Sequence, residues 1–137
     1  MQKHIGPNDM TSNTHDLSCH TGAPSAARRW TADCLRAHLG DRPPVPDLID
    51  DAVLCVSELV TNAVHAGCTS LRVELSFKDD GVRVGVVDDA PGRPALRSAG
   101  ASERSGRGLR LVEAVSRRWG VDVVERGKLV WAEFATS

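Results

Sequence analysis

One long amphipathic segment, residues 46–67, constrains the fold of this chain more than any other feature. It begins at Pro46-Asp47, where proline suits the first turn of a helix and an acid suits its positive end, and it ends at Gly67. Its apolar residues recur every three or four positions: Leu48, Ala52, Cys55, Val56, Leu59, Val60 and Ala63. We therefore expect a helix with one broad side in the core.

The rest of the chain alternates between the helical and the strand period. The expected elements, in chain order, are a helix over 24–39, strands over 71–77 and 82–88, a helix over 107–119, and strands over 121–125 and 129–134. Glycine and proline end the first helix, and Gly120 is expected to end the third. Strands joined by tight turns predict an α+β fold: a two-layer sandwich of a mixed, mostly antiparallel sheet with three helices on one face.

The length of 137 residues fits one domain. Residues 1–22 are polar and lack apolar periodicity, so we expect a flexible N-terminal tail there and one domain over 23–137. The 17 basic and 18 acidic residues give a net charge of −1, which argues against a nucleic-acid or membrane-surface partner.

The cysteines and the N-terminus bear on the compartment. The four cysteines are widely spaced and form no C-x-x-C pair, which is typical of a cytosolic protein without a disulfide framework. The opening residues, MQKHIGPNDM, lack the apolar stretch of a signal peptide, and no apolar run reaches the length of a membrane span. We expect a soluble, cytoplasmic protein.

The long helix carries an unusual polar stripe. Glu58, Thr61, Asn62 and His65 share one narrow face, with apolar residues on both flanks. A polar stripe on a helix is most often a solvated face. The narrowness of this one indicates instead that its polar groups face a cavity.

Two loops also carry polar or glycine-rich signals. VVDDAPGRP, residues 86–94, leaves a strand with an aspartate, an arrangement that suits either a ligand site or a plain turn. SGRGLRLVEAV, residues 105–115, places Gly106 and Gly108 before a helical pattern, where free N–H groups can bind an anion. The glycines fit neither a Walker loop nor a Rossmann fingerprint, and alone they are weak signals.

The three signals together are far more specific. S-E-L-V-T-N-A on a helix, D-D-A-P-G after a strand and G-R-G-L opening a helix resemble the ATPase superfamily of gyrase, Hsp90, histidine kinases and MutL, whose fold is the Bergerat type. The compact length and the closing G-K-L-V-W-A-E-F strand look like the small anti-sigma-factor serine/threonine kinases, the RsbW-like family. The resemblance covers residues 24–135.

This resemblance implies roles for the polar residues. Asn62 would coordinate the Mg²⁺ that bridges the phosphates of ATP, and Glu58 would act as general base. Asp88 would accept a hydrogen bond from the adenine amino group, although Asp89 is the alternative. Ala90 stands where the superfamily has a glycine, so its methyl group is expected to weaken nucleotide binding.

The resemblance also implies a nucleotide loop. Residues 93–105 would form a lid over the nucleotide, with an arginine reaching the γ-phosphate. The residues expected to contact the nucleotide in this region are Gly92, Arg104, Gly106, Arg107, Gly108 and Leu109.

Two functions follow from the resemblance. The first is an ATP- and Mg²⁺-dependent kinase that phosphorylates an anti-anti-sigma (STAS-type) partner on Ser/Thr and sequesters a sigma factor. The second is a non-catalytic, nucleotide-responsive module that controls a regulatory partner by contact. Glu58 favours the kinase, and Ala90 leaves the second function open. A second copy of the chain is a further candidate partner.

Overall fold

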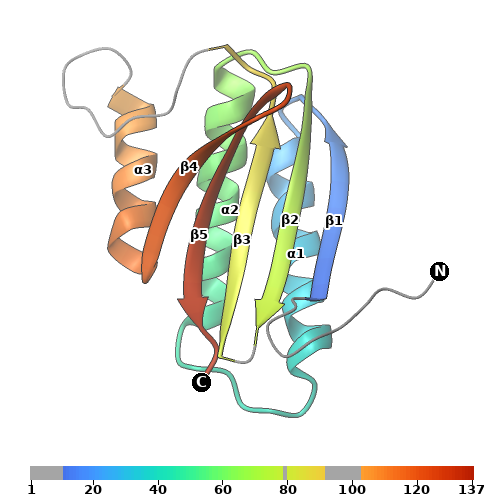
Figure 1. Ribbon diagram of the computed structural model, residues 1–137, viewed down its shortest axis with the longest axis vertical. Helices are drawn as coiled ribbons and strands as arrows, with labels where there is room; N and C mark the ends of the chain where they lie inside the picture. Colours follow the sequence, from blue (N-terminus) through green and yellow to red (C-terminus); the bar gives the residue numbers. More distant parts are fainter. Residues whose placement is uncertain (1–10, 79, 92–102) are drawn as a thin grey trace.

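The computed structural model describes residues 11–78, 80–91 and 103–137. One five-stranded sheet and three helices form two layers, with the helices on one face of the sheet (Figure 1). The elements are β1 (Thr11–Ser18), α1 (Ala23–Leu39), α2 (Leu48–His65), β2 (Ser70–Lys78), β3 (Gly81–Asp88), α3 (Glu103–Val115), β4 (Arg118–Val124) and β5 (Gly127–Ala135). Among the described helices, none is both long enough and apolar enough to cross a membrane.

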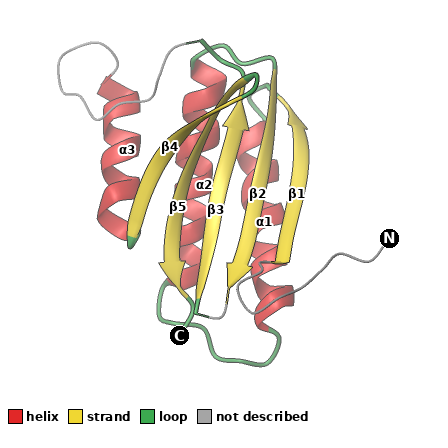
Figure 2. Cartoon of the chain, viewed as in Figure 1, coloured by secondary structure: helices red, strands yellow, loops and turns green. Residues whose placement is uncertain are grey.

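The sheet has the strand order β1-β2-β3-β5-β4, and every pairing is antiparallel. Figure 2 shows α1 and α2 behind the strands, and the core lies between these two layers. Strand β3 is central, with Asp88 at its end paired to Leu71 of β2 and to Lys128 of β5. The expected α+β sandwich is therefore confirmed.

The expected flexible tail is wrong for residues 11–22. Residues Thr11–Ser18 form the edge strand β1, which pairs with all of β2 except its last residue. The inward side chains of β1 also pack on the helical layer: the His15 ring stacks on Trp30 of α1 at 5.4 Å between centroids. The sequence signal was weak because only the alternate positions of an edge strand are covered, and here they are a mixture of polar and apolar residues.

The expectation of no disulfide is also wrong. Cys19, just after β1, is bonded to Cys68 in the loop between α2 and β2, 49 residues away. Cys34 and Cys55 are free, as their places on apolar helix faces predict. Burial raises the pKa of the Cys55 thiol to about 12, which keeps it protonated and inert.

The third helix lies four residues earlier than its periodicity predicts. It spans Glu103–Val115, and Trp119 and Gly120 belong to β4. Gly120 is therefore not a helix stop. A Cβ on this residue would lie 2.5 Å from the Trp131 ring, so the glycine makes room for the indole on the neighbouring strand.

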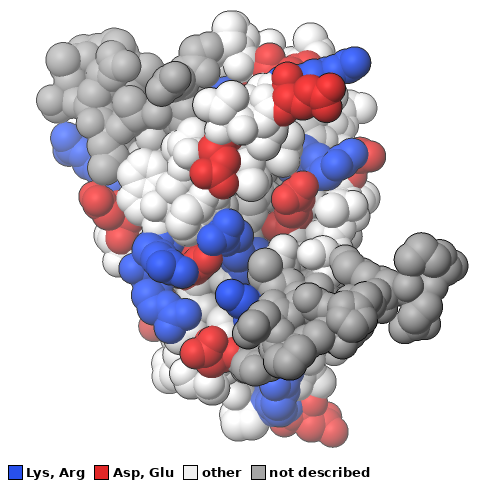
Figure 3. All heavy atoms as spheres, in the orientation of Figure 1, with Lys and Arg blue, Asp and Glu red and all other residues white. Residues whose placement is uncertain are grey.

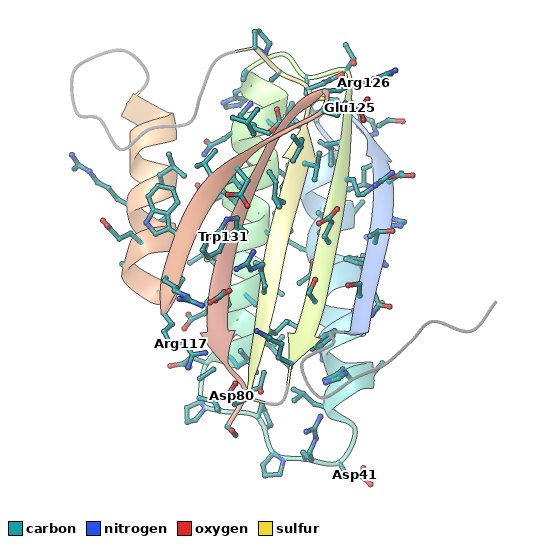
Figure 4. The ribbon with its side chains drawn as sticks, in the orientation of Figure 1. Asp41, Asp80, Arg117, Glu125, Arg126 and Trp131 are labelled. Atoms are coloured by element: carbon teal, nitrogen blue, oxygen red, sulfur yellow. A yellow bond between two sulfur atoms is a disulfide. The ribbon has the colours of Figure 1, made fainter. Side chains whose placement is uncertain are left out.

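The sheet face opposite the helices carries many charged side chains (Figure 3). Basic side chains gather around an acid in its lower part (Figure 3). Arg83 and Arg118 both bind the carboxylate of Glu133, and the Arg83 guanidinium lies 3.9 Å from the centre of the Trp131 ring. Figure 4 shows Trp131 on this face, with the turn between β4 and β5 above it.

The disulfide provides a test of the place of β1 in the fold. Closing a loop of 49 residues is expected to stabilise the folded state by about 4 kcal/mol through the entropy of the unfolded chain. In urea unfolding, the double variant Cys19→Ala/Cys68→Ala should lose stability of this order relative to oxidised wild type. As a control, Cys34→Ala keeps the disulfide, so reduction should lower its stability as much as that of wild type. Equal midpoints for the double variant and the oxidised wild type would contradict the pairing.

Candidate functional site

The polar stripe of α2 faces α3 at a glycine. Glu58 and Asn62 lie one turn apart on α2 and are both half-buried. A Cβ added to Gly108 of α3 would lie 2.9 Å from Glu58 Oε1 and 3.3 Å from Asn62 Nδ2. A side chain at this position would push against the Glu58 carboxylate and the Asn62 amide, so glycine keeps α3 close to both. The structure therefore brings together three of the residues that the motifs single out.

Of these three residues, Asn62 gives the strongest indication of a ligand site. Both polar atoms of its side chain, Nδ2 and Oδ1, are buried, and neither has a hydrogen-bond partner in the part of the chain that the structure describes. Leaving such a group unpaired costs about 1–3 kcal/mol, so an unpaired amide in a native fold calls for an explanation. An amide oxygen is a suitable ligand for Mg²⁺, which takes few protein ligands besides phosphate oxygens and water. Asn62 fits the metal role.

The glycines of the G-R-G-L motif lie inside α3 and not before it. Because the helix begins at Glu103, its free N–H groups lie in its first turn. Gly106 belongs to this first turn, whereas Gly108 serves the close contact with α2. Leu109 is fully buried in the core.

Several predicted residues are not placed by the structure. Gly92 and most of the expected lid, 93–105, lie outside the described residues. Arg104 and Arg107 are in α3, but the structure does not describe their side chains. The contact of either arginine with a phosphate therefore stays a prediction.

The second part of the site is the bend where β3 ends, Asp88-Asp89-Ala90, which we call the β3 elbow. Asp88 is only 5% exposed and lies on the same face of β3 as Val84 and Val86, towards the helices. Asp88 therefore faces the interior, and its expected contact with adenine stays a prediction. Asp88 Oδ1 accepts hydrogen bonds from Ala90 N at 2.8 Å and from Lys128 Nζ at 2.8 Å.

Asp89 points outwards and has a different task. Its carboxylate accepts hydrogen bonds from the hydroxyl and the backbone N–H of Thr69 and from Ser70 N. These bonds lower the pKa of Asp89 to about 2, with the Thr69 hydroxyl as the largest cause. Asp89 therefore ties the β3 elbow to the loop after α2, and Asp88 is the residue available to the interior.

Ala90 does not strain the β3 elbow. Among the described non-glycine residues, only Asp47 has a positive φ, so the position of Ala90 does not require a glycine. The residue is buried, with 6% exposure. The backbone at Ala90 is therefore unstrained, and the expected weakening of nucleotide binding by its methyl group stays a prediction.

Sequence reasoning missed Lys128. Its ammonium group also donates to the carbonyl oxygen of Ala90, at 3.2 Å, and the side chain is 12% exposed. The signal was present: Lys128 is in phase with the inward residues Val130, Ala132 and Phe134 of β5. A lysine at an inward position of a buried strand needs an acidic partner.

Comparison with known proteins agrees with this geometry. Residues 21–134 match the family model described as a histidine kinase-like ATPase domain. An uncharacterized protein of Streptomyces coelicolor, SCO4941, is 40% identical over 72 residues, which cover 49% of this chain and 69% of that protein.

A solved structure has the same fold. The crystal structure of the RsbU and RsbW domains of Rv1364c from Mycobacterium tuberculosis superposes with a TM-score of 0.66 at 20% identity. The match covers 93% of this chain and 33% of that one, so this chain spans one third of the solved chain. Because the family model matches most of its length, the chain belongs to the histidine kinase-like ATPase domain family.

Proposed function

We propose that this chain is a regulatory kinase of the anti-sigma-factor type, which transfers phosphate from ATP to Ser/Thr of a STAS-type partner. One observation carries the proposal: the buried amide of Asn62, which has no hydrogen-bond partner among the described residues, lies beside Glu58 at the glycine contact with α3. The family supports ATP as the nucleotide. The likeness to a structure that contains an RsbW domain supports the kinase type.

The described residues divide the binding task between two ends of the site. Asn62 Oδ1 is the proposed protein ligand of Mg²⁺, which when bound neutralises charge on the phosphates. The first turn of α3 offers free N–H groups to phosphate oxygens. Asp88, at the β3 elbow, is the proposed acceptor for the adenine 6-amino group. Gly92, Arg104 and Arg107 stay candidates for the loop around the nucleotide.

Glu58 is the proposed general base. It lies on the Asn62 side of α2 and next to Gly108, so its carboxylate can reach a group that approaches the phosphates. In the transfer, the partner's hydroxyl oxygen forms a bond to the γ-phosphorus while the bond from that phosphorus to the ADP oxygen breaks. Glu58 accepts the hydroxyl proton.

The proposed partners follow from the kinase type. They are a STAS-type anti-anti-sigma protein, which is the phosphate acceptor, and a sigma factor, which the free kinase holds. A second copy of the chain is a further proposed partner. We place this activity in the cytoplasm, where a sigma factor acts.

A second function is favoured by one observation. Gly108 lies in close contact with Glu58 and Asn62, so a phosphate group that binds between Asn62 and Gly108 requires α3 to shift. A partner that contacts α3 could sense the nucleotide through this shift without any phosphate transfer. The chain would then be a non-catalytic, nucleotide-responsive module.

Asn62→Ala tests the metal ligand. The variant should lose the Mg²⁺-dependent increase in ATP affinity, measured by calorimetric titration with and without a chelator. Because the amide has no described partner, the free energy of unfolding should stay unchanged or rise by about 1 kcal/mol. Thr61→Ala, at the preceding half-buried position, is the control and should keep the metal dependence. A wild-type response to Mg²⁺ in Asn62→Ala would rule out this ligand.

Glu58→Gln separates the two functions. If Glu58 is the general base, the variant should bind Mg·ATP and its partner normally but transfer phosphate at least about a hundredfold more slowly. Glu113→Gln, on the exposed side of α3, is the matched control and should transfer at the wild-type rate. Wild type that binds ATP but phosphorylates no STAS-type partner would favour the non-catalytic module.

A further inference from the structure

Lys128 is placed to control the β3 elbow. Its Nζ atom donates to two acceptors of the elbow, Asp88 Oδ1 at 2.8 Å and the Ala90 carbonyl oxygen at 3.2 Å. The lysine and Asp88 also face each other in the register of β5 and β3. The Lys128 side chain thus binds both the carboxylate of Asp88 and the backbone of Ala90, two residues further along the chain.

The start of β5 is shaped to bring Lys128 there. A Cβ on Gly127 would overlap the carbonyl oxygen of Asp88 and lie 3.1 Å from the Cα of Asp89, so the backbone of β5 lies directly against the elbow. A side chain at position 127 would push the elbow away from β5, so the glycine lets Lys128 lie next to it. On its other side, Asp89 holds the elbow to Thr69 and Ser70.

The hydrogen bonds described for Asp88 both end on one carboxylate oxygen. Ala90 N and Lys128 Nζ donate to Oδ1, and two donors on one oxygen fix the orientation of the carboxylate plane. An ionised carboxylate is acceptor-only, so Oδ2 can receive a donor but offers none. A base with an amino group at this place gains a hydrogen bond, and a base with a carbonyl group there meets an acceptor.

We propose that Lys128 is a positioning residue that holds Asp88 as an oriented acceptor and so sets a preference for 6-amino over 6-oxo purine nucleotides. This inference rests on the proposed nucleotide function. The lysine acts through Asp88 and need not touch the base itself. Removing it frees the carboxylate to turn, which weakens its bond to a 6-amino group and relieves its conflict with a 6-oxo group.

A purely structural ion pair would behave differently. The Lys128–Asp88 pair is largely buried, and breaking such a pair destabilises a fold. A loss of fold would weaken the binding of every nucleotide by the same factor. The ratio of the affinities for ATP and ITP, which differ at the 6-position, therefore separates positioning from stability.

The experiment titrates ATP and ITP, each with Mg²⁺, into the full chain and its variants, after circular dichroism has shown that each is folded. Wild type should bind ATP at least about tenfold more tightly than ITP, the factor expected for one hydrogen bond to a charged group. Lys128→Met keeps the length of the side chain without its charge. It should raise the Kd for ATP about tenfold and change the Kd for ITP less than about twofold.

Three further variants control the test. Lys128→Arg keeps the donors and should restore most of the preference for ATP. Lys78→Met removes an exposed lysine of the same sheet and should bind both nucleotides as wild type does. Should Lys128→Met fail to fold, Lys128→Gln, which keeps an amide donor without charge, should show an intermediate preference.

The outcomes separate this inference from the function on which it rests. Wild type that binds neither nucleotide would refute the proposed function. Wild type that binds ATP and ITP equally, or a Lys128→Met or Lys128→Gln variant that keeps the full wild-type preference, would refute the role of Lys128 and leave ATP binding standing.

Discussion

Helix α2 packs against α1, α3 and the sheet, and this packing is the constraint on which the site depends. It decides which polar side chains of α2 lie in the interior beside α3. The apolar side of α2 is fully occupied by the core, from Leu48 to Ala63. Glu58 and Asn62 lie where α2 faces α3, and Gly108 of α3 puts no side chain between them. The result is a buried amide without a described partner, a costly group that a bound phosphate and metal would satisfy.

The other end of the site depends on an elbow that three contacts hold, one to the loop after α2 and two to β5. Asp89 binds the loop after α2, Gly127 lies against the backbone, and Lys128 binds Asp88 and Ala90. The disulfide from Cys19 reaches the residue just before Thr69, so β1 is joined to the same region. The elbow is therefore fixed by contacts from residues far apart in the chain, as a recognition group needs to be.

The sequence predicted most of the fold because most of its periodic signals are local. The long helix, the hairpin of β2 and β3 and the last strand were all found from spacing and turn residues. Strand β1 was missed because its pattern is half polar and only its pairing with β2 identifies it. The bounds of α3 were misplaced because Gly120 reads as a helix stop, whereas it serves a contact with Trp131 across two strands.

Part of the site was also predicted, because some of its residues stand in local patterns. Glu58, Asn62 and Asp88 stand in short motifs, and their orientations follow from the periods of a helix and a strand. The phase of β5 places Lys128 inward, but its partner Asp88 lies 40 residues away and the partner of Asp89 lies 20 residues away, and no local pattern encodes such contacts. The disulfide likewise needs the fold to bring Cys19 and Cys68 together.

The central claim is that Asn62 and Gly108 mark the place of the metal and the phosphates. A co-crystal with Mn²⁺ and a non-hydrolysable ATP analogue tests it most directly, because the anomalous signal locates the metal without reference to the protein. The account predicts one peak at coordination distance from Asn62 Oδ1, with phosphate oxygens between α2 and the first turn of α3. A metal peak away from Asn62, or a nucleotide bound on the sheet face opposite the helices, would contradict it.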